Sequence, residues 1–109
     1  MVGDGIVIHS SDDVISSPIE GRIVSVYPSG HAFIVENKSL KVLIHIGIDT
    51  FQFHKYYEII KETGTTIRVG TPVIKINHSI LGMSSIDIII AILDQQKVNK
   101  TRKKTSIPK

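Results

Sequence analysis

Apolar and polar residues alternate along the chain in short runs, and turn residues such as Gly, Pro and Asn separate these runs. Short alternating runs between turn signals are typical of the strands of an all-β sandwich or barrel. The expected strands cover residues 5–9, 14–15, 22–27, 31–36, 40–46, 71–77 and 85–93. The pattern therefore predicts an all-β fold.

Two segments allow a helical interpretation. Residues 85–93 are almost continuously apolar and suit a buried strand or a buried helix, and their isoleucine content favours the strand. Residues 54–63 are expected to form a short helix, because Tyr56, Ile59 and Ile60 share one helical face and Gly64 ends it.

Length and composition restrict the class of protein. The chain has 109 residues, which is the size of one small domain, and 41% of them are apolar. It has no cysteine, which excludes disulfides, Cys-based zinc sites and cysteine nucleophiles. No apolar run reaches the roughly 18 residues of a membrane span. The N-terminus lacks the basic region and the apolar stretch of a signal peptide. We therefore expect a cytoplasmic protein.

The net charge of +3 is unevenly distributed. Residues 97–109 hold six of the 13 basic residues and no acidic residue, so residues 1–96 carry seven basic against ten acidic side chains. We expect a mildly acidic β domain over residues 1–96 and a disordered basic tail over residues 97–109. Such a tail can contact nucleic acid or anionic lipid. No nucleic-acid partner is expected, because residues 1–96 have no basic stripe interleaved with aromatic residues.

The chain contains five histidines, and the predicted hairpin over residues 31–46 brings two of them together. A three-residue turn at 37–39 would pair Glu36 with Leu40 and set His31 opposite His45, with Cβ atoms about 4.5–5.5 Å apart. Ala32, Ile34, Val42 and Ile44 would then share the core face, and His31, Phe33, Leu43 and His45 the opposite face. This pairing depends on the turn length, because a slip of one residue exchanges the two faces.

Two neighbouring imidazoles among apolar residues permit several interpretations. A neutral pair can share an anion or a metal ion, or one ring can act as a nucleophile while the other donates a hydrogen bond. A metal site needs at least a third ligand, for which Asp49 is the nearest candidate. Two ordinary half-exposed histidines are an equally good interpretation of the spacing. The remaining histidines, His9, His54 and His78, lie in or beside polar segments and are expected at the surface.

Four separated motifs favour one of these interpretations of the histidine pair. They are Gly3-Asp4-Gly5-Ile6-Val7-Ile8, Ser17-Pro18-Ile19-Glu20-Gly21-Arg22-Ile23, Ser29-Gly30-His31-Ala32-Phe33 and His45-Ile46-Gly47-Ile48-Asp49-Thr50. In order and approximate spacing, over roughly residues 2–81, they resemble the glucose-family enzyme IIA domain of the bacterial phosphoenolpyruvate:sugar phosphotransferase system. The resemblance implies a compact antiparallel β-sandwich in which two histidines lie in a shallow apolar depression.

The resemblance also implies a function and its residues. His45 would accept a phosphoryl group from the phosphohistidine of the carrier protein HPr and pass it to the cysteine of a sugar-specific IIB domain. His31 would bind the phosphoryl group without carrying it, and Ser29 matches a threonine that orients this partner histidine. No cofactor or metal is implied, and contact with the membrane would be indirect, through the sugar permease.

Supporting residues follow from the same resemblance. Tyr27, Phe33 and Leu43 would form the apolar rim that docks both partner proteins. Asp49 would order the loop beside the site, or cap its turn through an ordinary structural role.

The sequence departs from the family pattern at its N-terminal side, where the family usually carries 30–40 further residues. We therefore expect a shortened member, and a non-catalytic regulatory or binding protein of the same fold is the alternative. A zinc hydrolase of the lysostaphin type is a weaker alternative, because its His-x-x-x-Asp motif matches residues 45–49 but its His-x-His motif is absent.

Overall fold

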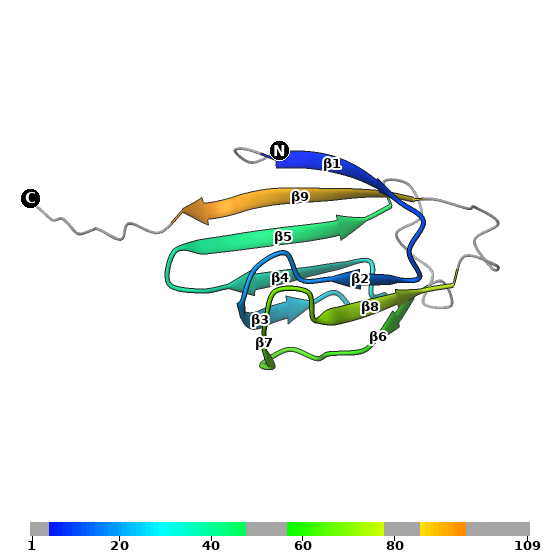
Figure 1. Cartoon of the computed structure of the whole chain (residues 1–109). Coiled ribbons are helices and arrows are strands. Elements are labelled where there is room, and N and C mark those ends of the chain that lie inside the picture. The colour runs from blue at the N-terminus through cyan, green and yellow to red at the C-terminus, as the bar shows by residue number, and fades with distance from the viewer. Residues whose placement is uncertain (1–4, 48–56, 78–85, 96–109) are drawn as a thin grey trace, which may run out of the picture.

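The computed structural model describes residues 5–47, 57–77 and 86–95, and every regular element within them is a β-strand. The strands are β1 (Gly5–Ser10), β2 (Val14–Ser16), β3 (Gly21–Val26), β4 (Ala32–Glu36), β5 (Leu40–Ile46), β6 (Tyr57–Ile59), β7 (Thr66–Ile67), β8 (Pro72–Ile76) and β9 (Ile86–Gln95) (Figure 1). The predicted all-β fold is confirmed. Within this part of the chain, no helix is long and apolar enough to span a membrane.

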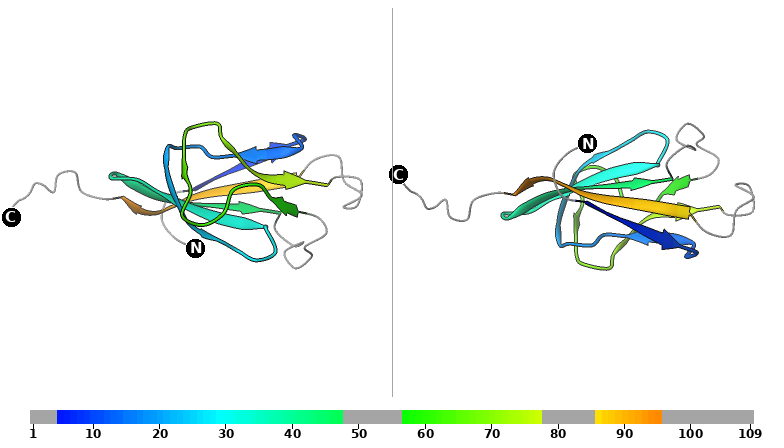
Figure 2. Two further views of the ribbon diagram at one scale, coloured as in Figure 1. Left: turned by 90° about the horizontal axis from the view of Figure 1, so that it is seen from below. Right: turned by 90° about the horizontal axis from the view of Figure 1, so that it is seen from above.

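The strands form two antiparallel sheets. The large sheet has the order β1-β9-β5-β4-β3-β7, and the small sheet has the order β2-β8-β6. Every pairing between neighbouring strands is antiparallel. The two sheets lie face to face as two layers of a sandwich (Figure 2).

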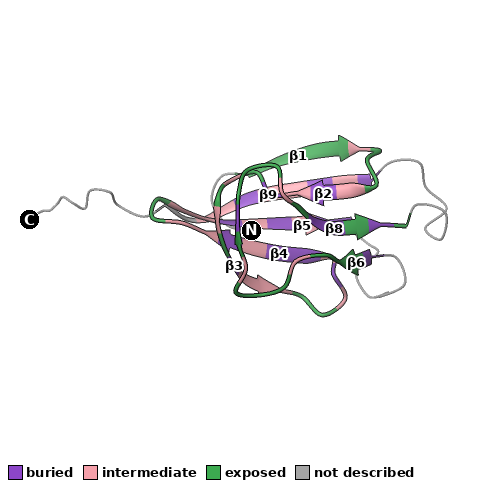
Figure 3. Cartoon of the chain, turned by 60° about the horizontal axis from the view of Figure 1, so that its bottom comes forward, coloured by how far each residue is buried: buried purple, intermediate pink, exposed green. Residues whose placement is uncertain are grey.

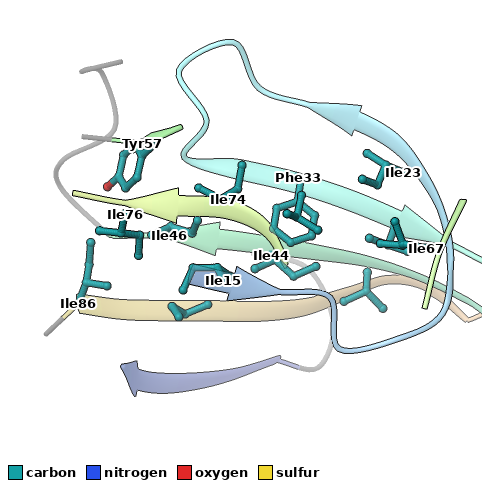
Figure 4. Packing of buried hydrophobic residues seen from close by; sticks show 14 residues of the cluster. Ile15, Ile23, Phe33, Ile44, Ile46, Tyr57, Ile67, Ile74, Ile76 and Ile86 are labelled. Carbon is teal, nitrogen blue, oxygen red and sulfur yellow. The ribbon is translucent and has the colours of Figure 1, made fainter. Parts of the chain in front are cut away.

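The core lies between the two sheets. Alternation along β5 turns Val42, Ile44 and Ile46 inward, each at most 3% exposed. Side chains from the small sheet, such as Ile74 and Ile76, pack against them (Figure 4). Nearly all of this core is β-branched aliphatic, which suits the pleated surface of a sheet.

One edge of the large sheet remains exposed. In β1, Ile6 and Val7 are each 58% exposed and Ile8 is 40% exposed (Figure 3). β1 pairs with β9 on one side only, and the small sheet does not bury its inward side chains. Apolar residues on an edge strand of this kind are a surface for association.

Two details of the prediction were wrong. Residues 57–59 were expected in a helix, but they form β6 and pair with β8. The other error concerns the register of the β4–β5 hairpin, in which Glu36 pairs with Lys41, the N–H of Asn37 donates to the carbonyl of Leu40 at 2.9 Å, and Ala32 pairs with His45. The shift of one residue places Phe33 in the core, where it is fully buried, and moves Ile34 to the opposite face.

The predicted boundary between a β domain and a basic tail is not tested, because residues 97–109 lie outside the described part of the chain. It stays a prediction.

Candidate functional site

The two central histidines meet at one end of the large sheet, where β4 begins and β5 ends. His45 is the penultimate residue of β5, and His31 immediately precedes β4. The N–H of Ile46 donates to the carbonyl of His31 at 2.7 Å, which extends the ladder by one bond beyond the paired residues. This bond holds the backbone of His31 beside the end of β5.

The turn before His31 depends on a glycine. The N–H of Gly30 donates to the carbonyl of Tyr27 at 2.7 Å, and the N–H of Tyr27 donates to the carbonyl of Ala32 at 2.9 Å. Gly30 has a φ of 80°, and a Cβ at this position would lie 3.0 Å from the Cβ of Tyr57. Both the left-handed conformation and the close neighbour favour a residue without a side chain.

The imidazole rings of His31 and His45 lie edge to face. Their centroids are 5.3 Å apart and their planes are inclined by 79°. The prediction that the two rings lie together is confirmed, although the residue directly opposite His45 is Ala32. His31 lies just outside β4, so the alternation of side chains between the two faces of that strand does not determine the direction of its ring. Its ring can therefore lie beside that of His45.

Ser29 and Tyr27 fix the ring of His31. The Oγ of Ser29 is hydrogen-bonded to Nδ1 of His31, the ring that the family resemblance leads us to expect Ser29 to orient. The ring of Tyr27 lies 5.2 Å from that of His31 at an inclination of 72°. With Nδ1 engaged, the Nε2 of His31 is the nitrogen available to a bound group.

Burial closes one of the two ring nitrogens of His45 to a partner. Its Nδ1 is completely buried, and within the described residues no group meets normal hydrogen-bond geometry with it. The backbone of Gly47 lies close enough to favour the protonated ring. Nε2 is therefore the nitrogen that a partner can reach.

Both imidazoles are held in the neutral form. Burial lowers the pKa of His31 below 6.5, and the neighbouring His45 lowers it further by charge repulsion. Burial also lowers the pKa of His45 below 6.5, and the backbone of Gly47 opposes this shift. Neutral imidazoles with an accessible nitrogen are nucleophiles near pH 7.

The outward face of the sheet surrounds His45 with apolar side chains. Cross-strand pairing sets Ala32, His45, Ile89 and Val7 in one row across β4, β5, β9 and β1. Leu43 lies on the same face two residues before His45 and is partly buried.

Two of the three residues expected in the docking rim are at the surface. Tyr27 is 41% exposed, and Leu43 belongs to the outward face. Phe33 does not belong to the rim, because its side chain is 0% exposed in the core. The remaining predicted site residue, Asp49, lies outside the described residues.

An ion pair at the same end of the sheet was not anticipated. Nδ1 of His9 on β1 contacts Oδ1 of Asp87 on β9. No sequence pattern suggested it, because the two residues are far apart in the chain and meet only through the β1–β9 pairing. Within the described residues, no cluster of three His, Asp or Glu side chains could hold a metal ion.

Comparison with known proteins identifies the family of this chain. Residues 1–99 match the model of the family described as phosphoenolpyruvate-dependent sugar phosphotransferase system, EIIA 1. The chain belongs to this EIIA family. The resemblance of its four motifs is thereby confirmed.

Relatives in the EIIA family support the assignment. The chain is 34% identical over 95 residues to the glucose-specific EIIA component of Staphylococcus epidermidis, covering 85% of this chain and 57% of the relative. It is 29% identical over 94 residues to the N-acetylglucosamine-specific EIICBA component of Klebsiella pneumoniae, covering 84% of this chain and 14% of that protein. The chain thus spans little more than half the length of the single-component relative.

A solved EIIA structure shares the fold. The glucose permease IIA from Mycoplasma capricolum superposes with a TM-score of 0.74 at 26% identity, covering 83% of this chain and 61% of the other. The predicted glucose-permease-IIA-like sandwich is therefore confirmed.

Proposed function

We propose that this chain is a phosphocarrier in sugar uptake, accepting a phosphoryl group on His45 and passing it to a permease domain. The observation that carries the proposal is the edge-to-face pair of His31 and His45, with the Nδ1 of His45 buried. The membership in the EIIA family supports it.

The chemistry needs one neutral nucleophile and good alignment. The lone pair of Nε2 in His45 attacks phosphorus, a new P–N bond forms, and the P–N bond to the donor imidazole breaks with its electron pair returning to the donor ring. The lowered pKa favours the neutral ring at neutral pH, and the attack uses the tautomer whose remaining proton is on Nδ1. Phosphoryl transfer of this kind depends mainly on positioning and charge stabilisation.

His31 acts as the stabilising partner in this proposal. Ser29 holds its Nδ1, which leaves its Nε2 to bind a phosphoryl group on the neighbouring ring of His45. A proton on that nitrogen would donate a charge-assisted hydrogen bond to a phosphoryl oxygen. HPr is the proposed donor, and the IIB domain of a sugar permease is the proposed acceptor.

Variants of the two histidines test these roles. After incubation with phosphoenolpyruvate, enzyme I and HPr, we expect His45→Gln to carry no acid-labile phosphoryl group. His31→Gln should still become labelled and should release the group to a IIB domain at least tenfold more slowly, as is typical when a general acid–base or charge-stabilising group is removed. Undiminished labelling of His45→Gln would refute the assignment of the acceptor.

A non-catalytic regulatory or binding protein of the same fold is the second candidate, and the exposed apolar side chains of β1 favour it. It predicts that neither variant nor the unaltered protein becomes labelled, while binding of a partner protein persists. The labelling experiment therefore separates the two candidates.

A further inference from the structure

The edges of the two sheets differ in how they are protected against pairing with another chain. Among the strands that the structure describes, β7, β2 and β6 form short edges of two, three and three residues. β6 also carries the charged Glu58, and the register of β2 against β8 is irregular. Short length, charge and irregular register are features by which natural sheets avoid association at their edges.

The remaining edge strand, β1, has none of these protective features. It has six residues, contains no Lys, Arg, Asp, Glu or Pro, and pairs with β9 without a register shift. Ile6 and Ile8 on its inward face and Val7 on its outward face are all exposed. An apolar edge strand without protection is a template for the pairing of a further strand.

The sequence of β1 makes a second copy of the same strand a suitable partner. In an antiparallel pair with two-fold symmetry, opposite residues share a face, so the axis passes through a residue. With the axis at Val7, this residue faces its own copy and Ile6 faces Ile8. Gly5 then faces His9, so the large imidazole meets no side chain. An axis at either neighbouring residue sets Val7 opposite Gly5 or His9 and loses this apolar match.

We propose that β1 is a dimerisation surface, at which two copies of this chain pair antiparallel through their β1 strands with the two-fold axis at Val7. The large sheets of the two copies then join edge to edge, and the open backbone groups of β1 gain hydrogen bonds. A second copy supplies the matching apolar pattern by symmetry and brings no like charges into contact. The inference is independent of the proposed phosphocarrier function, because it needs only the edge strand.

This dimer places both histidine pairs on one surface. Val7 lies in the same row as Ile89 and His45, and the row continues through the axis into the second copy. The two His45 residues are separated by five strand spacings, or roughly 24 Å. The interface therefore lies beside the two sites and does not include them.

One strand pair is a small interface, in the size class of transient complexes below roughly 1,200 Å². We therefore expect the monomer, with β1 in contact with water, in dilute solution, and the dimer as concentration rises. Sedimentation equilibrium should give a mass that increases with concentration from the 12.1 kDa of one chain towards twice that value. A mass that stays at 12.1 kDa up to the solubility limit of the protein would overturn the inference.

The residue at the two-fold axis allows a sharp test, because one substitution acts twice. We expect Val7→Lys to weaken association roughly tenfold or more, since it sets two ammonium groups directly opposite each other, and Val7→Glu to do the same with two carboxylates. An equimolar mixture of the two variants should associate again, because opposite charges then meet at the axis. Salt should weaken that mixed dimer. Recovery in the mixture separates lost pairing from lost folding.

Val69→Lys is the matched control. Val69 is 66% exposed between β7 and β8 and lies outside the proposed interface, so this variant should associate like the unaltered protein. Equal weakening by Val7→Lys and Val69→Lys, or no recovery of association in the mixture, would overturn the pairing at Val7.

Cross-linking tests the register directly. The chain has no cysteine, so Val7→Cys introduces a single thiol. Opposite residues of an antiparallel pair have Cα atoms about 4.5–5.5 Å apart, within the range of roughly 4.4–6.8 Å that a disulfide spans. Under air oxidation we expect Val7→Cys to form a covalent dimer several times faster than Val69→Cys. Equal rates for the two variants would contradict the proposed register.

Discussion

The chemistry of the site depends on how single residues are placed at the end of two strands. His31 escapes the alternation of β4 because it precedes the strand, and the turn through Gly30 directs its ring to His45. The pairing from the expected register did not hold, since Ala32 lies opposite His45, and it was the family resemblance that led us to expect both the neighbouring rings and the contact of Ser29 with His31. The sequence was insufficient for Phe33, because the relative faces of the two strands depend on the turn geometry, and the observed register differs by one residue from the expected one.

The sequence pattern could not predict contacts between residues on strands that are far apart in the chain. His9 and Asp87 carry no motif, and their contact exists because β9 inserts between β1 and β5. Alternation predicts which strands form, but it does not predict their order in a sheet.

The lowered pKa values of His31 and His45 lead to a prediction for acid stability. Between the lowered pKa and the ordinary value of 6.5, the unfolded chain binds more protons than the folded one, so stability increases with pH in this range. The stabilisation should be fully present above pH 6.5 and be lost as pH falls through the lowered values. NMR titration of the imidazole C–H signals should place both midpoints below 6.5.

Urea unfolding provides the second readout of the same prediction. The variant with both His31→Gln and His45→Gln should lose less stability between pH 7 and pH 5 than the unaltered protein. An equal loss in the two proteins, or midpoints at 6.5 or above, would contradict the placement of buried neutral imidazoles.

Gly30 provides a second prediction at the scale of the residue. Gly30→Ala must adopt a φ of 80° and bring its Cβ within 3.0 Å of the Tyr57 Cβ, whereas Gly70→Ala meets a similar φ of 85° with no atom within 4 Å. A left-handed conformation costs a non-glycine residue about 1–2 kcal/mol.

We expect both glycine variants to lose roughly this free energy of unfolding, and Gly30→Ala to lose more and to accept phosphate more slowly. The measurements are urea unfolding and the rate of phosphoryl acceptance. Equal stability and equal rates in the two variants would show that the turn before His31 tolerates a side chain.

At the scale of the element, the sequence predicted strands better than it predicted the segment before Gly64. The expected limits of β5 match the observed ones, and those of β1 differ by one residue. Within residues 54–63 the spacing of Tyr56, Ile59 and Ile60 favoured a helix, but residues 57–59 pair with β8 and form β6. Tertiary pairing therefore overrode a weak local preference.

Strands that are both rich in isoleucine differ in how deeply their side chains are buried. Ile44 and Ile6 belong to one row of the large sheet, linked through Ile90, yet Ile44 is 1% exposed and Ile6 is 58% exposed. We expect Ile44→Ala to cost about 2–5 kcal/mol of unfolding free energy, as is usual for a buried isoleucine.

The same truncation in β1, Ile6→Ala, should cost less than about 1 kcal/mol, because most of that side chain is already in contact with water. Chemical denaturation of both variants is the measurement. A loss at Ile6 as large as that at Ile44 would mean that β1 is covered in solution, by a second copy or by another segment.

At the level of the whole fold, the small sheet packs on one face of the large sheet, and no described strand covers the outward face at its histidine end. Family membership and the shared sandwich place this protein among EIIA components, and its chain spans about 57% of the Staphylococcus epidermidis relative. The described strands hold the histidine pair, the serine that orients it and the apolar row around it. The central claim is that this set of residues is sufficient for phosphoryl transfer.

The most direct test of that claim is the intact mass of the protein after incubation with phosphoenolpyruvate, enzyme I and HPr. We expect one added phosphoryl group that is lost in acid and that requires HPr in the mixture. An unchanged mass, while a full-length EIIA relative becomes labelled under the same conditions, would contradict it.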